Sequence, residues 1–269
     1  MSDTPGRPIP LDALRFAFGT LTVLPVRVTR WDRETARGGM LCAPLAGLTA
    51  GLAAAALGGA VLLLGGGPLL AAVGAAAVPA ALTRGLHLDG LADTADGLGS
   101  ARPAEDALRI MKQSDIGPFG VITLVFALLA QVAALYELFG LGWAQGAVAA
   151  AVSGTVGRCA LTLASRAGVP AARPEGLGAA VAGTVPVRAA LWCTALVTVL
   201  CAAAGGALGG WDSGGWGALH TALAALSGLG TGELVLRHCR RRFGGVTGDV
   251  FGALAESAGL AALVVLALG

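Results

Sequence analysis

Residues 39–64 read GMLCAPLAGLTAGLAAAALGGAVLLL, a run without a single charged side chain. About 20 consecutive apolar residues are enough for a helix to cross the hydrocarbon core of a bilayer. Charged residues make up only 13% of the 269-residue chain, whereas about 25% is usual in soluble domains. The stretch therefore predicts a membrane-spanning helix, and the composition predicts that the rest of the chain is embedded with it.

Seven such spans are expected, and together they make residues 1–269 a single all-α, polytopic helical membrane domain. They cover residues 39–64, 69–88, 119–140, 144–164, 188–208, 216–236 and 250–268. Residues 11–26 are too short and too interrupted to span, so we expect a short N-terminal interfacial or half-spanning helix there. The 43 glycines suit close packing of helices in lipid.

The basic residues predict the orientation. All 18 lysines and arginines precede the first span or lie near the loops at 84–116, 158–188 and 237–242. The intervening loops at 65–68, 140–143 and 209–215 contain none. Because Lys and Arg are enriched in cytoplasmic loops, we expect the N-terminus inside, the C-terminus outside and the motifs described next on the cytoplasmic side.

An acidic stripe is predicted in HLDGLADTADGLG, residues 87–99. Asp89, Asp93 and Asp96 stand at i, i+4 and i+7, which places them within about 60° of one another around a helix. Three carboxylates on one face repel one another unless a cation lies among them. Mg²⁺ takes oxygen ligands of this kind, usually together with substrate phosphates. A helix cap would explain one of the three, Asp89, without any ligand.

A basic segment follows the stripe as RIMKQSDIGPFG, residues 109–120. Arg109 and Lys112, the only lysine in the chain, are one helical turn apart. With the Ser114 hydroxyl they are the groups that a pyrophosphate needs. Surface charges of an amphipathic helix are the alternative reading.

Two further segments carry charge at the predicted cytoplasmic ends of spans. Arg158 lies inside a span, where an unpaired charge is costly, and Arg166 follows it. FGGVTGDVFGALAE, residues 243–256, has the composition of a helix start that binds an anion or a metal. We expect this end to pack against the stripe and to contribute Asp249, and we expect Glu256 to pair with a buried arginine such as Arg158. A cap would explain Asp249 equally well.

Two other functions fit parts of this pattern. A cation-coupled transporter could use the carboxylates as an ion path, but its ionisable residues should lie near the bilayer midplane. A CDP-alcohol phosphatidyltransferase has a chemically similar acidic motif, but its D-G-x-x-A-R pattern is not met because Asp93 follows Ala92. The chain contains neither a phosphate-binding GxxxxGK[ST] loop nor a GxGxxG motif before a strand, and we expect no nucleic-acid partner.

Four ordered motifs give the chain a resemblance to a known family. HLDGLADTADGLG, RIMKQSDIGPFG, ARPEGLG at 172–178 and GGVTGDVFGALAE at 244–256 resemble those of cobalamin synthases, the adenosylcobinamide-GDP ribazoletransferases. Residues 16–26 resemble the family's N-terminal F-L-T-x-x-P-V element. The chain departs from the family at Lys112-Gln-Ser-Asp115, where the family often reads K/R-D-S-R.

The resemblance implies an enzyme of the bacterial cytoplasmic (inner) membrane that acts late in cobalamin biosynthesis. Its substrates would be adenosylcobinamide-GDP and α-ribazole or its 5′-phosphate, and its cofactor Mg²⁺. Residues Asp89, Asp93, Asp96 and Asp249 would hold the metal, with the three stripe aspartates also catalytic. Substrate phosphates would be bound by Arg109, Lys112, Ser114, Arg158, Arg166, Thr247 and Asp249. A homo-oligomer or a complex with other cobalamin-assembly enzymes is left open.

Overall fold

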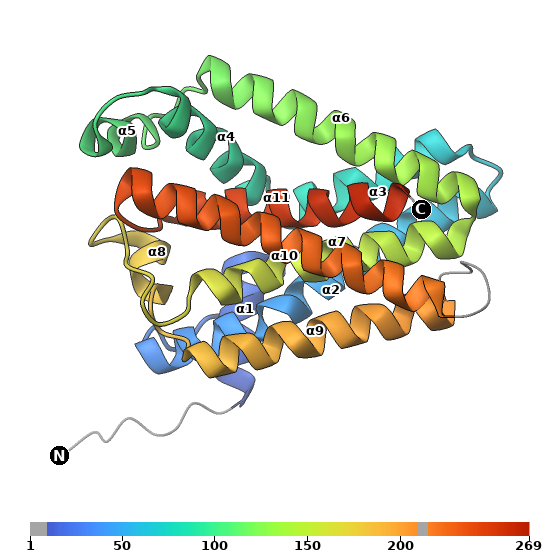
Figure 1. Cartoon of the computed structure of the whole chain (residues 1–269), viewed down its shortest axis with the longest axis horizontal. Helices are drawn as coiled ribbons and strands as arrows, with labels where there is room; N and C mark the ends of the chain where they lie inside the picture. Colours follow the sequence, from blue (N-terminus) through green and yellow to red (C-terminus); the bar gives the residue numbers. More distant parts are fainter. Residues whose placement is uncertain (1–9, 209–214, 269) are drawn as a thin grey trace.

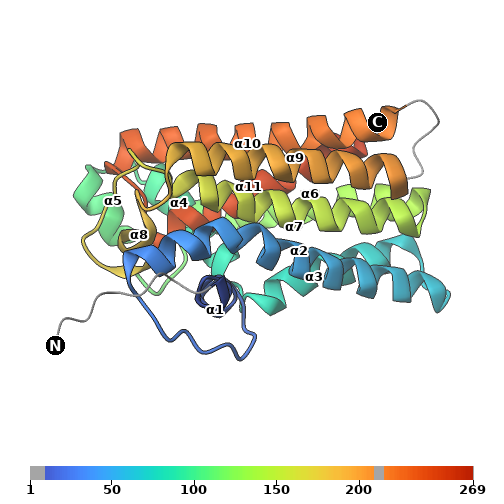
Figure 2. The ribbon, with the colours of Figure 1, turned by 90° about the horizontal axis from the view of Figure 1, so that it is seen from below.

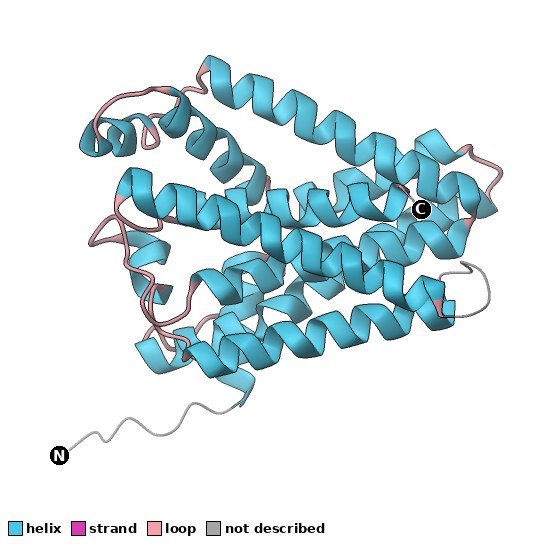
Figure 3. Cartoon of the chain, in the orientation of Figure 1, coloured by secondary structure: helices cyan, strands magenta, loops and turns pink. Residues whose placement is uncertain are grey.

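The structure, a computed structural model, describes residues 10–208 and 215–268, and these form helices without a strand (Figure 3). In chain order the helices are α1 (Pro10–Leu21), α2 (Arg33–Leu63), α3 (Pro68–Leu82), α4 (Leu86–Gly99), α5 (Ala104–Ile110), α6 (Pro118–Leu141), α7 (Trp143–Ala164), α8 (Gly176–Val181), α9 (Val187–Leu208), α10 (Trp216–Phe243) and α11 (Gly248–Ala267).

Six of these helices are long and apolar enough to cross a membrane: α2, α6, α7, α9, α10 and α11. A seventh crossing is the bent pair of α3 and α4, if the pair counts as one span. The all-α, polytopic architecture expected from the sequence is therefore confirmed. The predicted span at 69–88 differs, because α3 ends at Leu82 and the chain turns before α4 begins.

The spanning helices run up and down along the long axis of the molecule (Figure 1). Helices α2, α6, α9 and α11 begin at the end that carries α4, α5 and α8, and α3, α7 and α10 run toward it (Figures 1 and 2). We call this the motif end. All four sequence motifs start or finish at this end. Successive spans cross in opposite directions, so motifs at these ends of the spans are brought to the same side.

Small side chains let the central helices approach closely. Helix α7 runs through the middle of the bundle and packs against α2, α9, α10 and α11. The face of α2 that is buried consists largely of alanine and glycine, including Ala43, Ala46, Gly47 and Ala50. Such residues favour van der Waals contact between helices in lipid, where the hydrophobic effect does not drive association. The Thr162 hydroxyl adds a hydrogen bond of 2.6 Å to the Met40 carbonyl.

Helix α1 is short, as expected, and lies beside α2 near the motif end (Figure 2). Its buried residues Phe16, Ala17 and Leu21 recur on one helical face. The Phe16 ring meets the Trp31 ring edge-on, with 5.3 Å between centroids. Phe16 also packs against Gly39, so this packing holds α1 against α2.

Candidate active site

The chain turns sharply where α3 meets α4. The pair is bent by 87°. Arg84 (φ 50°) and Gly85 (φ 73°) both adopt the left-handed backbone region. The Val23 N–H donates to the Leu82 carbonyl at 2.7 Å and ties the segment after α1 to this corner. As a result α4 departs from the direction of α3 and lies at the motif end (Figure 1).

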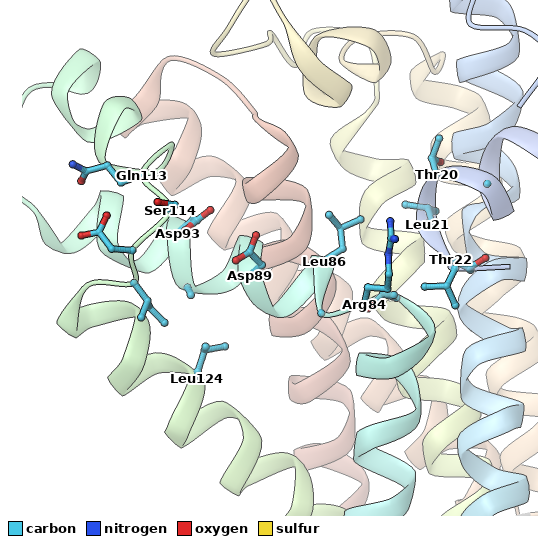
Figure 4. Close-up of a pocket in the computed structure, with 17 residues that line it drawn as sticks. Thr20, Leu21, Thr22, Arg84, Leu86, Asp89, Asp93, Gln113, Ser114 and Leu124 are labelled. Carbon is cyan, nitrogen blue, oxygen red and sulfur yellow. The ribbon is translucent and has the colours of Figure 1, made fainter. Parts of the chain in front are cut away.

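Asp89 and Asp93 of α4 line a cavity of about 760 Å³. Its other walls come from residues 19–23, 83–86 and 113–116. Figure 4 shows Asp93 and Asp89 in succession along α4, with Ser114 beside Asp93 and Leu86 beyond Asp89. The expectation that these two aspartates share one helical face is confirmed.

Asp96 has different surroundings from the other two stripe aspartates. Its side chain is buried, and its two oxygens accept hydrogen bonds from the Gly117 N–H at 2.8 Å and the Gly120 N–H at 2.9 Å. These donors belong to the first turn of α6, where backbone N–H groups have no partner within the helix. Asp96 therefore fastens the start of α6 to α4, and it is not among the residues that line the cavity.

The start of α11 brings a fourth carboxylate to α4. Thr247 caps the helix: its hydroxyl oxygen accepts from the Val250 N–H at 3.2 Å and lies 3.2 Å from Asp249 Oδ2. The Arg173 guanidinium forms an ion pair with Asp249, with 3.3 Å between Nη1 and Oδ2. Arg173 also donates to the Leu108 carbonyl. Asp249 is thus held by two side chains.

Two glycines allow the backbones of α4 and α11 to touch. A Cβ added at Gly90 would lie 2.6 Å from the Asp249 carbonyl oxygen, and one added at Gly252 would lie 2.8 Å from the His87 carbonyl oxygen. Any side chain at either position would force the helices apart. The expectation that the start of α11 packs against the stripe is therefore confirmed, whereas metal ligation by Asp249 stays a prediction.

Burial and the neighbouring carboxylates favour the protonated form of Asp93. The pKa of Asp93 is raised to about 7, first because its carboxylate is partly buried and then because Asp89, Asp249 and Asp96 are negatively charged. The positive charge of Arg173 acts in the opposite direction. Repulsion of this kind is relieved when a cation joins the carboxylates.

The donor set suits a cation that is shared with a ligand. Within residues 10–208 and 215–268, no three His, Cys, Asp or Glu side chains are grouped so that they could hold a metal ion by themselves. Mg²⁺ is usually bound by one or two carboxylates, several waters and substrate phosphates. Asp89 and Asp93 meet that requirement, and a site made only of protein ligands is not formed.

The predicted phosphate-binding residues after the stripe separate into two groups. Ser114 lines the cavity with Asp89 and Asp93. Arg109 forms an ion pair with Asp106 on the exposed side of α5, and Lys112 is exposed on the residues that follow α5. Neither basic residue lines the cavity: Arg109 is paired on α5, and Lys112 comes after the end of that helix.

The predicted arginines of α7 and its C-terminal end also have other partners. Arg158 is only 5% exposed, and its Nη2 lies 3.0 Å from His87 Nδ1. Because an arginine can only donate, this His87 nitrogen accepts. Arg166 forms an ion pair of 2.9 Å with Glu233 of α10. Neither arginine lines the cavity.

The predicted pairing of Glu256 with Arg158 is confirmed only in part: their opposite charges interact, but no direct ion pair joins them in the described part of the chain. Glu256 instead accepts a hydrogen bond of 2.9 Å from Gln131 of α6. Glu256 and Arg158 line the same small internal hollow, but α6 supplies a nearer donor to the carboxylate. Arg158 is engaged by His87 at the base of α4.

Sequence reasoning did not select Arg173 or Arg84 as site residues, and it noted His87 only as a neighbour of the stripe. Arg173 lies in the ARPEGLG motif, which was the signal that could have selected it. Arg84 and His87 flank the α3–α4 corner, and the corner was hidden inside a predicted span. Only the fold shows which groups Arg173 and His87 contact and that Arg84 lines the cavity.

Comparison with known proteins covers nearly the whole chain. The family model described as cobalamin-5-phosphate synthase matches residues 13–267. A protein of Frankia casuarinae named adenosylcobinamide-GDP ribazoletransferase is 44% identical over 94% of this chain and 94% of its own length. Proteins with the same name from a Nocardioides species and from Bradyrhizobium diazoefficiens are 42% and 38% identical, each over 94% of this chain and over 97% and 92% of their own lengths. No solved structure matches. The chain belongs to the cobalamin-5-phosphate synthase family.

Proposed function

We propose that this protein is an integral membrane transferase that joins α-ribazole, or α-ribazole 5′-phosphate, to adenosylcobinamide-GDP. The observation that carries the proposal is the match over residues 13–267, together with relatives of that name that align along 94% of the chain. This shared name favours ribazole transfer over cation-coupled transport and over CDP-alcohol phosphatidyl transfer.

The reaction exchanges one phosphate ester bond for another. The 3′-hydroxyl oxygen of the ribazole attacks the phosphorus that is linked to cobinamide. The bond between this phosphorus and the bridging oxygen of the pyrophosphate breaks, and GMP leaves with the bonding electron pair. The hydroxyl proton passes to a base, and adenosylcobalamin or its 5′-phosphate is formed.

The cavity at α4 supplies the groups for such a transfer. Asp89 and Asp93 would hold Mg²⁺ together with substrate phosphates, and when bound the ion would neutralise charge on the leaving GMP. One of these carboxylates would accept the hydroxyl proton, and Ser114 would donate a hydrogen bond to a phosphate oxygen. Arg173 holds Asp249 beside the two, whereas Asp96 fixes the wall that α6 forms.

The proposed location is the cytoplasmic membrane of a bacterium, with the motif end facing the cytoplasm. One-sided placement of the lysines and arginines supports this orientation. In intact cells, Glu105→Cys on the exposed side of α5 should resist a membrane-impermeant maleimide and react after the cells are opened. Labelling of this position in intact cells would contradict the orientation.

The proposed reaction is tested by release of GMP from adenosylcobinamide-GDP by the purified protein in lipid nanodiscs. We expect release that requires a ribazole acceptor and Mg²⁺, and a corrinoid product with the acceptor attached. EDTA should abolish the activity and excess Mg²⁺ should restore it. Absence of GMP release with either acceptor would overturn the proposed function, and release that is unaffected by EDTA would overturn the role of the metal.

A further inference from the structure

The cavity has a second end that the proposed chemistry does not use. Opposite the carboxylates, its wall is built by residues 19–23 at the end of α1 and by residues 83–86 at the α3–α4 corner. Figure 4 shows Arg84 at this end, beside Thr22 and Leu21, with Leu86 between it and Asp89. Asp93 and Ser114 lie farther along the same cavity. The cavity is thus acidic at one end and basic at the other.

Arg84 is the only cationic side chain among the described residues that line this cavity. It is exposed, and no hydrogen bond or ion pair to the described part of the chain engages its guanidinium. By contrast, Arg158, Arg166 and Arg173 are each bound to another residue. Arg84 therefore has its five N–H donors available to a ligand.

The backbone at Arg84 adds an independent observation. Its φ of 50° lies in the left-handed region, which is unfavourable for residues other than glycine. Strained positions of this kind cluster at ligand-binding sites, where the surrounding structure maintains them. Here the positive φ falls just after the end of α3, at a residue whose long cationic side chain lines the cavity.

We propose that Arg84 binds the 5′-phosphate of the ribazole acceptor, an inference that rests on the proposed function. The attacking 3′-hydroxyl and the 5′-phosphate belong to one ribose. An acceptor whose hydroxyl reaches the acidic end therefore extends its phosphate away from that end. The cation and the pyrophosphate of adenosylcobinamide-GDP would occupy the acidic end, and Arg84 is the one cationic side chain that the described lining offers to the 5′-phosphate. Arg84 is then a specificity-determining residue that favours the phosphorylated acceptor over free α-ribazole.

The test compares both acceptors at saturating adenosylcobinamide-GDP and Mg²⁺. For wild type, Arg84→Gln and Arg84→Gly, kcat/KM is measured with α-ribazole 5′-phosphate and with α-ribazole. The ratio of the two values should fall about tenfold in both variants, because a charge-assisted hydrogen bond is lost. Arg84→Gly also relieves the backbone strain, so a matching fall assigns the effect to the guanidinium. Arg188→Gln, at an exposed arginine of α9, is the control and should leave the ratio unchanged.

The other outcomes overturn the inference and identify the alternative. An equal loss with both acceptors would mean that Arg84 contacts the pyrophosphate of adenosylcobinamide-GDP instead. An unchanged ratio with full activity would mean that Arg84 binds no phosphate. If the wild-type protein uses neither acceptor, the proposed function fails and this inference fails with it. Binding of α-ribazole 5′-phosphate to the nanodisc-embedded protein, measured by calorimetry, should weaken by the same factor in Arg84→Gln.

Discussion

Replacement of Asp89 or Asp93 with asparagine is expected to lower turnover by about 10²–10³-fold, the usual cost of removing one electrostatic contact to a transition state. Both side chains line the cavity, and burial followed by the charges of Asp89, Asp249 and Asp96 raises the pKa of Asp93. Asparagine preserves the shape of the side chain but removes the negative charge. The cation would then be bound more weakly, and charge on the leaving GMP would be less well balanced.

GMP release by protein in nanodiscs measures this effect, with Mg²⁺ varied at each substrate concentration. The Mg²⁺ concentration for half-maximal rate should rise in both variants. Glu105→Gln is the matched control, because Glu105 is an exposed carboxylate of α5 outside the cavity. Near-normal turnover in both aspartate variants would show that these carboxylates only shape the helix surface.

Replacement of Asp96 with alanine is expected to destabilise the protein as well as to reduce its activity. The Asp96 carboxylate accepts from the Gly117 and Gly120 N–H groups in a buried environment. Alanine would leave two donors of the α6 N-terminus without a partner, at a cost of about 1–3 kcal/mol for each. Asp96→Asn keeps one acceptor oxygen, so its loss of stability should be smaller.

Thermal unfolding in detergent separates this role from metal binding. The melting temperature should fall in the order wild type, Asp96→Asn, Asp96→Ala, whereas Asp89→Asn should leave it close to the wild-type value. If the two Asp96 variants are equally inactive and unfold at the wild-type temperature, the carboxylate acts in the reaction and not in attaching α6.

The motifs predicted the site only in part. Asp89 and Asp93 could be placed on one face because their spacing is a property of a single helix. The approach of Asp249 could also be anticipated, since both motifs lie at ends of spans on the same side. The sequence did not show that Arg109 would stand on a separate short helix, α5, or that Arg109 and Lys112 would lie outside the lining of the cavity.

The sequence by itself determined the all-α membrane fold, the positions of the six single-helix spans and the end of the molecule that carries the motifs. The helices and spans follow from apolar stretches of about 20 residues, and the shared end of the motifs follows from the up-and-down order of the spans. Neither property depends on contacts between residues that are distant in the sequence. Only the tertiary structure decided the turn at Arg84 and Gly85, the pairing of Arg158 with His87 and the attachment of Asp96 to α6. An apolar stretch predicts a helix but does not show where the helix bends. A buried polar group forms hydrogen bonds with whichever partner the packing brings close, and that partner often belongs to a remote part of the chain.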